Sequence, residues 1–289
     1  MLANGDKVKK GVEVKTQYCT AIPIGTALAQ SWNLELAEGC GDIVGDELER
    51  FGVHLWLAPA LNIHRSILCG RNFEYFGEDP YLAGEIAASY IIGLQSQGVM
   101  ANMKHFAANN QEYARHSVSS DVDERTLHEI YFPAFEKAVK KAGVASIMTS
   151  YNLLNSVHAS ESKYLNYDVL RDMWGFRGFV ISDWNSCYSP LNVSTWGVDL
   201  EMPKPVCMTP ETLTELLHNG MLDEASLDRK CRHIIRTILD FEFDRRPQLD
   251  KSIPENNPYS DFVALEVSRS AVVLLKNNEG FLPLKKGNF

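Results

Sequence analysis

The segment from Phe179 to Trp184, with the sequence FVISDW, places a carboxylate directly after a short apolar run. Glycine precedes Phe179, and the pattern predicts a buried strand that ends just before Asp183. A carboxylate at such a point loses its hydration, which is costly unless other groups bind it. Asp183 is therefore a candidate for chemistry or for a buried ion pair. The simpler alternative is that it caps the next helix or binds the local backbone.

Polar and charged side chains follow the other predicted strands in the same way. Each set alone has an ordinary explanation, since a Lys-His pair is usually solvated and a Tyr-Asn pair usually forms a turn. In a barrel of parallel strands, however, the carboxyl ends of the strands share one face, and that face carries the active site. We therefore expect one site at this face, built from Asn62, Arg65, Lys104, His105, Tyr151, Asn152, Asp183, Trp184 and Glu201.

This combination of residue types suits carbohydrate chemistry. Arginine, lysine, histidine and asparagine side chains bind sugar hydroxyls, and the indole of Trp184 offers an apolar face to a sugar ring. A carboxylate beneath C1, such as Asp183, can act as the nucleophile of a retaining glycosidase, and nearby cations would favour its ionised form. A metal site is not indicated, because His105 and His116 lack spaced acidic or cysteine partners. No G-x-S-x-G elbow surrounds Ser182, which argues against a serine nucleophile.

Alternating strands and helices must position these residues. Strand then helix occurs four times, which predicts a parallel sheet with crossover helices. No G-x-G-x-x-G string follows a strand, so a TIM-type (β/α)8-like barrel, incomplete or irregular, is favoured over a dinucleotide fold. Asp79, with Pro80 after it, and Asp123 are expected helix N-caps. The expected strands are 53–59, 99–106, 145–151, 179–181 and 197–203, and the expected helices are 34–51, 80–97, 124–142, 161–174, 209–219, 224–243 and 262–277, with loops at 1–20, 60–79 and 107–121 and a linker at 244–260.

Composition narrows the class of protein. The 289 residues are enough for one large α/β domain or two small ones, and 45% of them are hydrophobic. A net charge of -9 without any basic block makes nucleic acid an improbable partner. The six cysteines are scattered and form no C-x-x-C pair, so reduced thiols are expected. No apolar stretch is long enough for a bilayer and no secretory signal is recognisable, so we expect a cytoplasmic protein without a membrane partner.

Six strings in order resemble glycoside hydrolase family 3, and within it the bacterial β-glucosidases. The resemblance runs from about Ala21 to the end of the chain, and it is specific because the first string is long. The strings are CGRNFEYFGEDPYLAG (69–84), KHFAANNQE (104–112), VDERTLHEIYFPAFEKAV (122–139), SYN (150–152), WGFRGFVISDW (174–184) and DLEMP (199–203).

This resemblance implies a retaining glycosidase that acts on terminal β-D-glucosyl residues of a β-glucoside or oligosaccharide, without a cofactor. It implies that Asp183 is the nucleophile. It also implies a sugar pocket formed by Arg71, Lys104, His105 and Tyr151, with Arg115 and Trp184 lining it more loosely.

Several other carboxylates near these strings are better explained by structure than by catalysis. Glu74 is expected to pair with Arg71, and Asp79 to cap a helix, which leaves little reason to place a second catalytic carboxyl at Glu78. Glu201 is expected to be structural or to lie at the rim of the pocket.

The sequence also departs from the family pattern. No D-G-P-x-G string of a first barrel strand is present, so we expect that strand to be missing. The family's acid/base glutamate usually lies in a following α/β sandwich domain, and the string VVLLKNNEGFLPLKKG (272–287) resembles the entry to it. A histidine in a P-G-H-G string replaces that glutamate in some members, but the corresponding loop here reads AANNQEYARHS.

We therefore expect a barrel domain at residues 1–243 and a linker and helix at 244–289 that lead towards an absent domain. Such a chain alone is expected to be inactive or very weakly active, with a second domain or chain supplying the acid/base. Three alternatives stay open: a carbohydrate-binding or assembly fragment without catalysis, β-xylosidase-type specificity, and an unrelated aldolase in which Lys104 forms a Schiff base.

Overall fold

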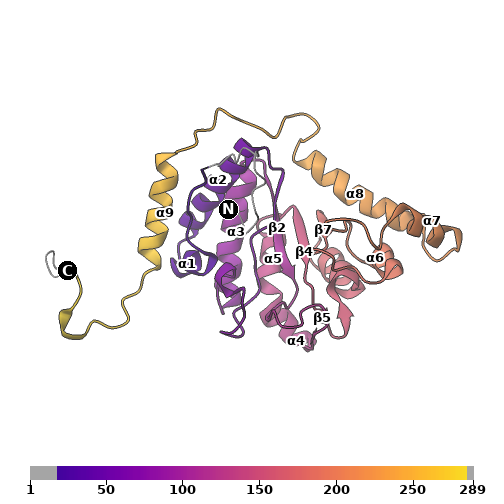
Figure 1. Ribbon diagram of the computed structural model, residues 1–289, viewed down its shortest axis with the longest axis horizontal. Coiled ribbons are helices and arrows are strands. Elements are labelled where there is room, and N and C mark those ends of the chain that lie inside the picture. Colours follow the sequence, from indigo (N-terminus) through magenta and orange to yellow (C-terminus); the bar gives the residue numbers. More distant parts are fainter. Residues whose placement is uncertain (1–17, 285–289) are drawn as a thin grey trace, which may run out of the picture.

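A parallel four-stranded sheet forms the centre of the molecule (Figure 1). The computed structural model describes residues 18–284. The strands are β1 (Leu55–Trp56), β2 (Met100–Phe106), β4 (Ser146–Thr149) and β7 (Phe179–Ile181), in the order β1-β2-β4-β7. All three neighbouring pairs are parallel, and Met148 lies opposite Ile181 in the last pair. The prediction of a parallel sheet with crossover helices is confirmed.

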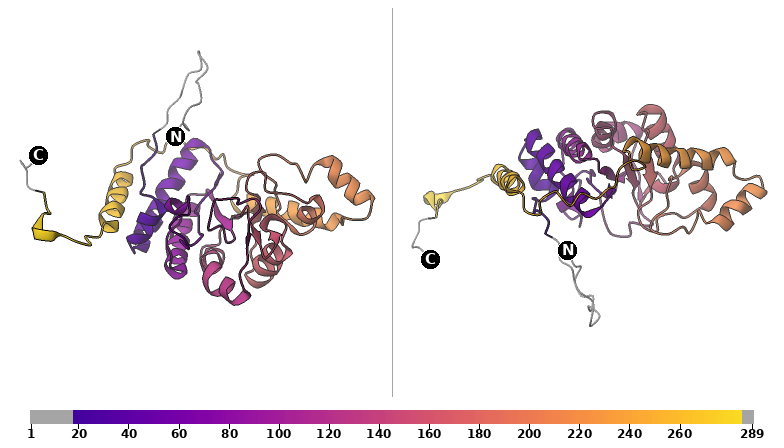
Figure 2. Two further views of the ribbon diagram at one scale, coloured as in Figure 1. Left: turned by 60° about the horizontal axis from the view of Figure 1, so that its bottom comes forward. Right: turned by 90° about the horizontal axis from the view of Figure 1, so that it is seen from above.

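Long helices cover one side of this sheet. Helix α3 (Pro80–Ser96) lies between α2 (Leu34–Phe51) and α5 (Pro133–Lys140), as Figures 1 and 2 show. The predicted start of α3 is confirmed, because the Asp79 carboxylate accepts the backbone N–H groups of Tyr81 and Leu82. Helix α2 is terminated by Gly52, the residue after its end, whose φ of 75° is the left-handed conformation that glycine adopts most easily.

The region 124–142 contains three helical segments where one helix was predicted. They are α4 (Glu124–Thr126), a π-helical segment (Leu127–Tyr131) and α5, which starts at Pro133. Proline has no backbone N–H and its ring collides with the preceding turn, so a regular α-helix cannot pass through Pro133. The predicted helix 161–174 is likewise a 3-10 turn (Ala159–Glu161) followed by a π-helical segment (Tyr164–Met173).

The first and the last of the predicted strands differ most from expectation. Only Leu55–Trp56 of 53–59 pairs as a regular strand, since Pro59 offers no N–H to a ladder. The predicted strand 197–203 is wrong: Leu200 makes a single parallel bridge to Ile181. The reason is that the side chain of Asp199 accepts the backbone N–H of Val180 in place of a main-chain partner.

Several elements were not predicted from the sequence. They include α1 (Gly25–Gln30), α6 (Pro190–Trp196) and a small sheet of β3 (Ser119–Ser120), β5 (Leu153–Leu154) and β6 (Val157–His158). Strands β5 and β6 form a tight hairpin through Asn155 and Ser156, whose φ angles are 48° and 69°. Two successive positive φ angles are typical of the turns that suit hairpins, and asparagine tolerates them better than most residues.

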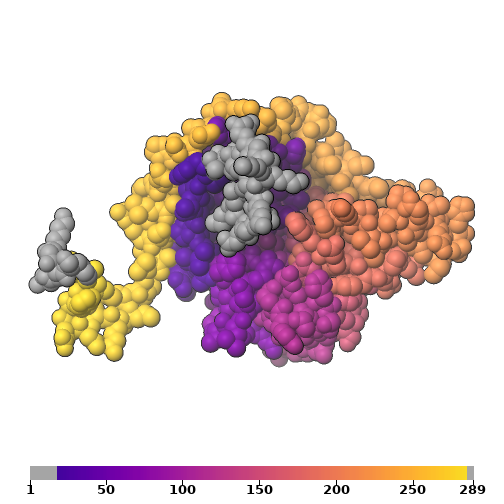
Figure 3. Space-filling model, in the orientation of Figure 1, coloured from indigo at the N-terminus to yellow at the C-terminus, as the bar shows by residue number. Residues whose placement is uncertain are grey.

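Helices α7 (Pro210–His218) and α8 (Glu224–Asp240) follow the sheet, and α9 (Pro258–Ala271) returns to pack against α1 and α2 (Figures 1 and 2). Helix α9 begins earlier than predicted because the side chain of Asn257 caps it and Pro258 occupies its first turn. It also ends at Ala271 and not at 277. The extended segment after it stands away from the rest of the molecule, as Figure 3 shows. The predicted loop at 1–20 lies, up to residue 17, outside the described residues.

The core has two parts, one on each side of the sheet. Side chains from β2, β4 and β7 pack outward against α2, α3 and α5, with Phe106 and Phe135 fully buried among them. A second cluster on the opposite side contains Met148 and Phe179 and includes Phe241 beyond the end of α8. Strands that are buried on both sides are typical of parallel sheets in α/β proteins. Between residues 18 and 284, none of the helices has the length and apolar character that crossing a membrane requires.

Helices α2 and α3 approach so closely that two glycines face the opposing backbone. A methyl group on Gly93 would lie 2.1 Å from the carbonyl oxygen of Glu38, and one on Gly41 would lie 2.2 Å from that of Tyr90. No side chain fits such a gap, so the glycines set the distance between the two helices.

Replacing Gly93 by alanine should lower the free energy of unfolding by about 1–3 kcal/mol, because the backbones of α2 and α3 must move apart. A loss of stability would be informative, because the higher helix propensity of alanine would by itself stabilise the protein by roughly 1 kcal/mol. Urea denaturation measures the change. Gly77→Ala is the matched control, because nothing lies within 4 Å of a methyl group at Gly77. Equal stability of the two variants would contradict the close approach.

Candidate active site

Three neighbouring strands bring the predicted site residues together at their carboxyl ends. Lys104 and His105 lie in the last part of β2, Tyr151 follows β4, and Asp183 follows β7. The Nε2 atom of His105 lies 3.6 Å from Oδ2 of Asp183. The Oδ1 atom of Asp183 accepts the backbone N–H of Trp184 at 2.7 Å, whereas Oδ2 has no hydrogen-bond partner among the described residues. One buried carboxylate oxygen is therefore left for another group.

His105 is fully buried and held on two sides. Its backbone N–H and carbonyl both bind the side chain of Asn62, at 3.0 Å each. The hydroxyl of Tyr75 lies 3.4 Å from Nδ1, and Asn109 in turn donates to that hydroxyl. Burial, together with the charges of Arg71 and its neighbours, keeps the pKa of His105 well below its usual value. The contact with Asp183 is thus no ion pair. The Tyr75 hydroxyl lies 3.4 Å both from Nδ1 of His105 and from the carbonyl oxygen of Asn109, so it can donate to either of them.

Two cations share one carboxylate next to this histidine. The Nε of Arg71 forms a short ion pair with Oε1 of Glu74, and Nζ of Lys104 lies 3.7 Å from Oε2. All three side chains are largely shielded from solvent. Burial lowers the pKa of Lys104, while Glu74 acts in the opposite direction. The prediction that Glu74 pairs with Arg71 is confirmed.

Tyr151 lies between Asp183 and the long loop after β2. The guanidinium of Arg115 is 4.1 Å from the centre of the Tyr151 ring, and Oε2 of Glu112 holds that guanidinium at 2.6 Å. Burial, with the neighbouring Asp183 as the second cause, raises the pKa of Tyr151 to about 12. The hydroxyl therefore stays protonated at any physiological pH and can donate a hydrogen bond.

Opposing effects act on the ionisation of Asp183. Burial raises its pKa, whereas the Trp184 N–H, the Tyr151 hydroxyl and the charges of Arg71 and Arg115 lower it. The expectation that nearby cations favour the ionised form is correct in direction for the two arginines. Burial is nevertheless the larger cause, so the net pKa of the carboxyl lies above that of an ordinary aspartic acid.

The other residues considered for the site differ in their exposure to solvent. The side chain of Trp184 is half exposed beside Asp183, and Arg65 is exposed in the loop after β1. Glu201 is buried, and its two oxygens accept the backbone N–H groups of Cys207 and Met208, so the structural interpretation holds. Glu78 is exposed. No cluster of three or more potential metal ligands occurs between residues 18 and 284.

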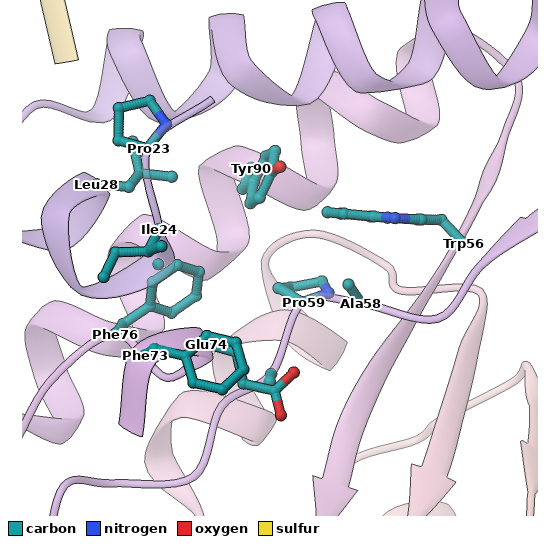
Figure 4. Close-up of a pocket in the computed structure, with 12 residues that line it drawn as sticks. Pro23, Ile24, Leu28, Trp56, Ala58, Pro59, Phe73, Glu74, Phe76 and Tyr90 are labelled. Atoms are coloured by element: carbon teal, nitrogen blue, oxygen red, sulfur yellow. The ribbon is translucent and has the colours of Figure 1, made fainter. Parts of the chain in front are cut away.

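An apolar cavity of about 260 Å³ lies next to the site (Figure 4). Its walls include Trp56, Pro59, Phe76 and Tyr90. It shares only Glu74 with the charged cluster, and Figure 4 shows that carboxylate at one end of the cavity. Most of the cavity wall is apolar, and Glu74 is the charged residue that lines it.

A buried polar network fixes the strand that leads to Asp183. Asp199 accepts from Arg171 at 2.9 Å, from Nδ1 of His233 at 2.9 Å and from the backbone N–H of Val180 at 2.8 Å. Nearby on α8, the ammonium of Lys230 donates to the carbonyls of Gly197 and Val198, both at 2.8 Å. The network joins β7 to α8.

Residues 2–237 match the N-terminal domain of glycosyl hydrolase family 3. The chain belongs to this family. It is 45% identical to thermostable β-glucosidase B of Acetivibrio thermocellus. The 269 aligned residues make up 92% of this chain and 35% of that relative. It is 40% identical to an exo-α-(1→6)-L-arabinopyranosidase of Bifidobacterium longum, over 93% of this chain and 35% of that protein.

Solved structures of family 3 enzymes have the same fold. The structure of β-glucosidase 3B from Thermotoga neapolitana in complex with glucose superimposes with a TM-score of 0.86 at 43% identity, over 96% of this chain and 39% of that one. The β-glucosidase from Kluyveromyces marxianus in complex with glucose gives a TM-score of 0.85 at 35% identity, over 93% of this chain and 33% of that one. The TIM-type fold is thereby confirmed, and the described strands form an open part of it. The chain spans about a third of the length of the curated relatives that it matches.

Sequence reasoning missed some residues of this candidate site. Tyr75 and Asn109 bind each other beside His105, and Glu112 fixes Arg115. Tyr75 and Asn109 lie within strings that carry the resemblance, but neither follows a strand directly. Their residue types could have indicated them, because a buried tyrosine hydroxyl and a buried asparagine amide both need hydrogen-bond partners.

The buried ammonium of Lys230 should make stability depend on pH. Burial, as the first cause, lowers its pKa from 10.5 to about 8, so between these values the unfolded chain binds a proton that the folded one does not. Stability should then rise with pH across this range relative to Lys230→Met, by up to about 1.4 kcal/mol per pH unit. Urea denaturation of both proteins at several pH values measures this difference. If the free energy of unfolding of the two proteins changed with pH by the same amount, the lowered pKa of Lys230 would be contradicted.

Proposed function

We propose that this chain carries the nucleophile and the sugar pocket of a retaining β-glucosidase that acts on terminal β-D-glucosyl residues. In this proposal the carboxylate of Asp183 attacks C1 and forms a covalent glycosyl ester, which water then hydrolyses. The observation that carries it is the buried Asp183 with one oxygen free of hydrogen bonds, beside the protonated hydroxyl of Tyr151 and 3.6 Å from Nε2 of the neutral His105.

The surroundings of Asp183 support a nucleophile more than an acid. Arg71 and Arg115 both lower the pKa of its carboxyl, and so do the Trp184 N–H and the Tyr151 hydroxyl, so four groups favour the carboxylate form against the larger effect of burial. The pocket that we propose for the sugar contains Arg71, Lys104, His105, Arg115, Tyr151 and Trp184. Buried cations and amides bind hydroxyls, and the half-exposed indole of Trp184 can cover an apolar sugar face.

A retaining mechanism needs a second carboxyl group roughly 5 Å from the first, to protonate the leaving oxygen. Among the described residues, the carboxylates near the site are already engaged: Glu74 by Arg71, Glu112 by Arg115, and Glu201 by backbone N–H groups. We therefore propose that the acid/base comes from a further domain or a second chain. In this reading residues 1–243 form the barrel domain, and 244–289 form the connection.

The family 3 relatives favour glucose as the sugar, but they do not all share one substrate. Several are β-glucosidases, and two solved relatives hold glucose, whereas the Bifidobacterium longum relative is an arabinopyranosidase. Residues that face C1 therefore define the reaction, and residues that face the other hydroxyls define the sugar. A binding fragment without catalysis remains the second candidate, favoured by the engaged carboxylates around Asp183.

The purified chain should form a glycosyl ester on Asp183 with a dinitrophenyl fluoroglucoside, whose phenolate leaves without protonation. It should hydrolyse cellobiose negligibly, since general acid catalysis is typically worth about 10²–10⁴-fold. Because burial raises the pKa of Asp183, labelling should decline as the pH falls, at a higher pH than an ordinary aspartate would require. Intact-mass spectrometry measures the ester. An unlabelled wild type, or a labelled Asp183→Asn variant, would refute the nucleophile and leave the binding fragment.

Replacing Lys104 by alanine should weaken glucose binding by about 1.5–3 kcal/mol, the usual contribution of a hydrogen bond to a charged group. Calorimetric titration measures the loss. The control is Lys140→Ala, because Lys140 also pairs with a glutamate, Glu136, but lies exposed on α5. Glucose affinity that is unchanged in Lys104→Ala, together with a large drop in melting temperature, would show that Lys104 is only an ion-pair partner.

A further inference from the structure

The backbone of Tyr151 is fixed by hydrogen bonds of its neighbours, whereas its ring is held by side chains from other loops. The flanking residues bind the main chain at the end of β2: the N–H of Ser150 donates to the carbonyl of Phe106, and the side chain of Asn152 donates to that of Ala107. These bonds leave rotation of the Tyr151 side chain free. The hydroxyl matters because it is one of the groups that lower the pKa of Asp183. The orientation of the ring thus determines whether the hydroxyl reaches the carboxylate.

Two consecutive residues of the loop after β2 contact this ring. Arg115 lies over it, held by Glu112, and the imidazole of His116 lies 4.3 Å from its centre at an angle of 52°. His116 is itself exposed and has no place in the core. A side chain in that position would move freely unless another group held it.

Tyr188, from the loop after β7, holds His116 in place. Its hydroxyl lies 3.0 Å from Nδ1 of His116. Its ring stacks on His158 of the β5–β6 hairpin, with 3.7 Å between ring centres and 19° between ring planes. Its backbone N–H donates to the buried Glu161 at 2.8 Å. Tyr188 is therefore fixed at both ends, and it passes that constraint to His116.

We propose that His116 and Tyr188 are positioning residues, which hold the ring of Tyr151 so that its hydroxyl faces the carboxylate of Asp183. The proposal rests on the proposed function of Asp183 as nucleophile and adds to it the means by which its partner is oriented. The contacts draw together three loops that the sheet alone does not connect, those that follow β2, β4 and β7. An exposed histidine–tyrosine hydrogen bond contributes little to folding, so its place beside Tyr151 is better explained by this role.

The test measures the ionisation of Asp183 directly and needs no sugar. Aspartate labelled with ¹³C at the carboxyl carbon is titrated by NMR, and the Asp183 signal is identified by its loss in Asp183→Asn. Tyr151→Phe should raise the pKa of Asp183, by up to about one unit, because it removes a neighbouring hydroxyl that lowers this pKa. His116→Ala and Tyr188→Phe should raise it in the same direction, by as much or less.

A double-mutant cycle separates positioning from other effects. If His116 acts through Tyr151, adding His116→Ala to Tyr151→Phe should cause no further shift. A shift that persists in the Tyr151→Phe background would overturn the proposal, because His116 would then act by another route, such as a displaced Arg115. No shift in either His116→Ala or Tyr188→Phe would overturn it as well.

The matched controls are His128→Ala and Tyr164→Phe. This second histidine–tyrosine pair, with 3.3 Å between the hydroxyl of Tyr164 and Nε2 of His128, belongs to the helical segments outside the site. Neither control should change the pKa of Asp183. Tyr188→Phe is the mildest variant, since it keeps the stacked ring, and it decides the matter if His116→Ala unfolds. Failure of covalent labelling would refute the nucleophile, whereas the NMR outcome tests only the orientation of Tyr151.

Discussion

The burial of one carboxylate, that of Asp183, is the constraint on which the rest of the site depends. A charged group at the end of a buried strand loses its water, and only nearby positive charge and hydrogen-bond donors can replace that hydration. The structure supplies both from different strand ends: arginines from two loops, a tyrosine hydroxyl from a third and a backbone N–H from the next residue. The balance leaves the pKa raised but keeps one oxygen without a hydrogen bond. The donors and cations compensate part of the lost hydration of the carboxylate, and the oxygen without a hydrogen bond is available to another group.

The cations around Asp183 are themselves held by acids of the same loops. Arg71 and Lys104 share Glu74, and Arg115 binds Glu112, so each positive side chain has a defined orientation before any ligand arrives. Fixed geometry of this kind lowers the entropy that binding would otherwise cost. It also means that Glu74 and Glu112, the two glutamates that bind these cations, are already engaged in ion pairs.

Much of this arrangement could be predicted from the sequence, for identifiable reasons. Strand ends in a parallel sheet must meet on one face, so Lys104, Tyr151 and Asp183 could be grouped without coordinates. Helix starts with strong local signals, such as Asp79 before Pro80, were also correct. The stack of His158 on Tyr188 was out of reach, because it joins a short hairpin to a distant loop. The strand predicted at 197–203 failed because a side chain, that of Asp199, took the place of a backbone partner.

Asp199 has a mechanical consequence for the nucleophile. Its single carboxylate joins three elements: β7 through Val180, the segment before β7 through Arg171, and α8 through His233. Val180 lies three residues before Asp183 on a strand that cannot slide independently of its neighbours. The position of helix α8 and the position of the strand that leads to Asp183 are therefore tied to each other through a single buried side chain.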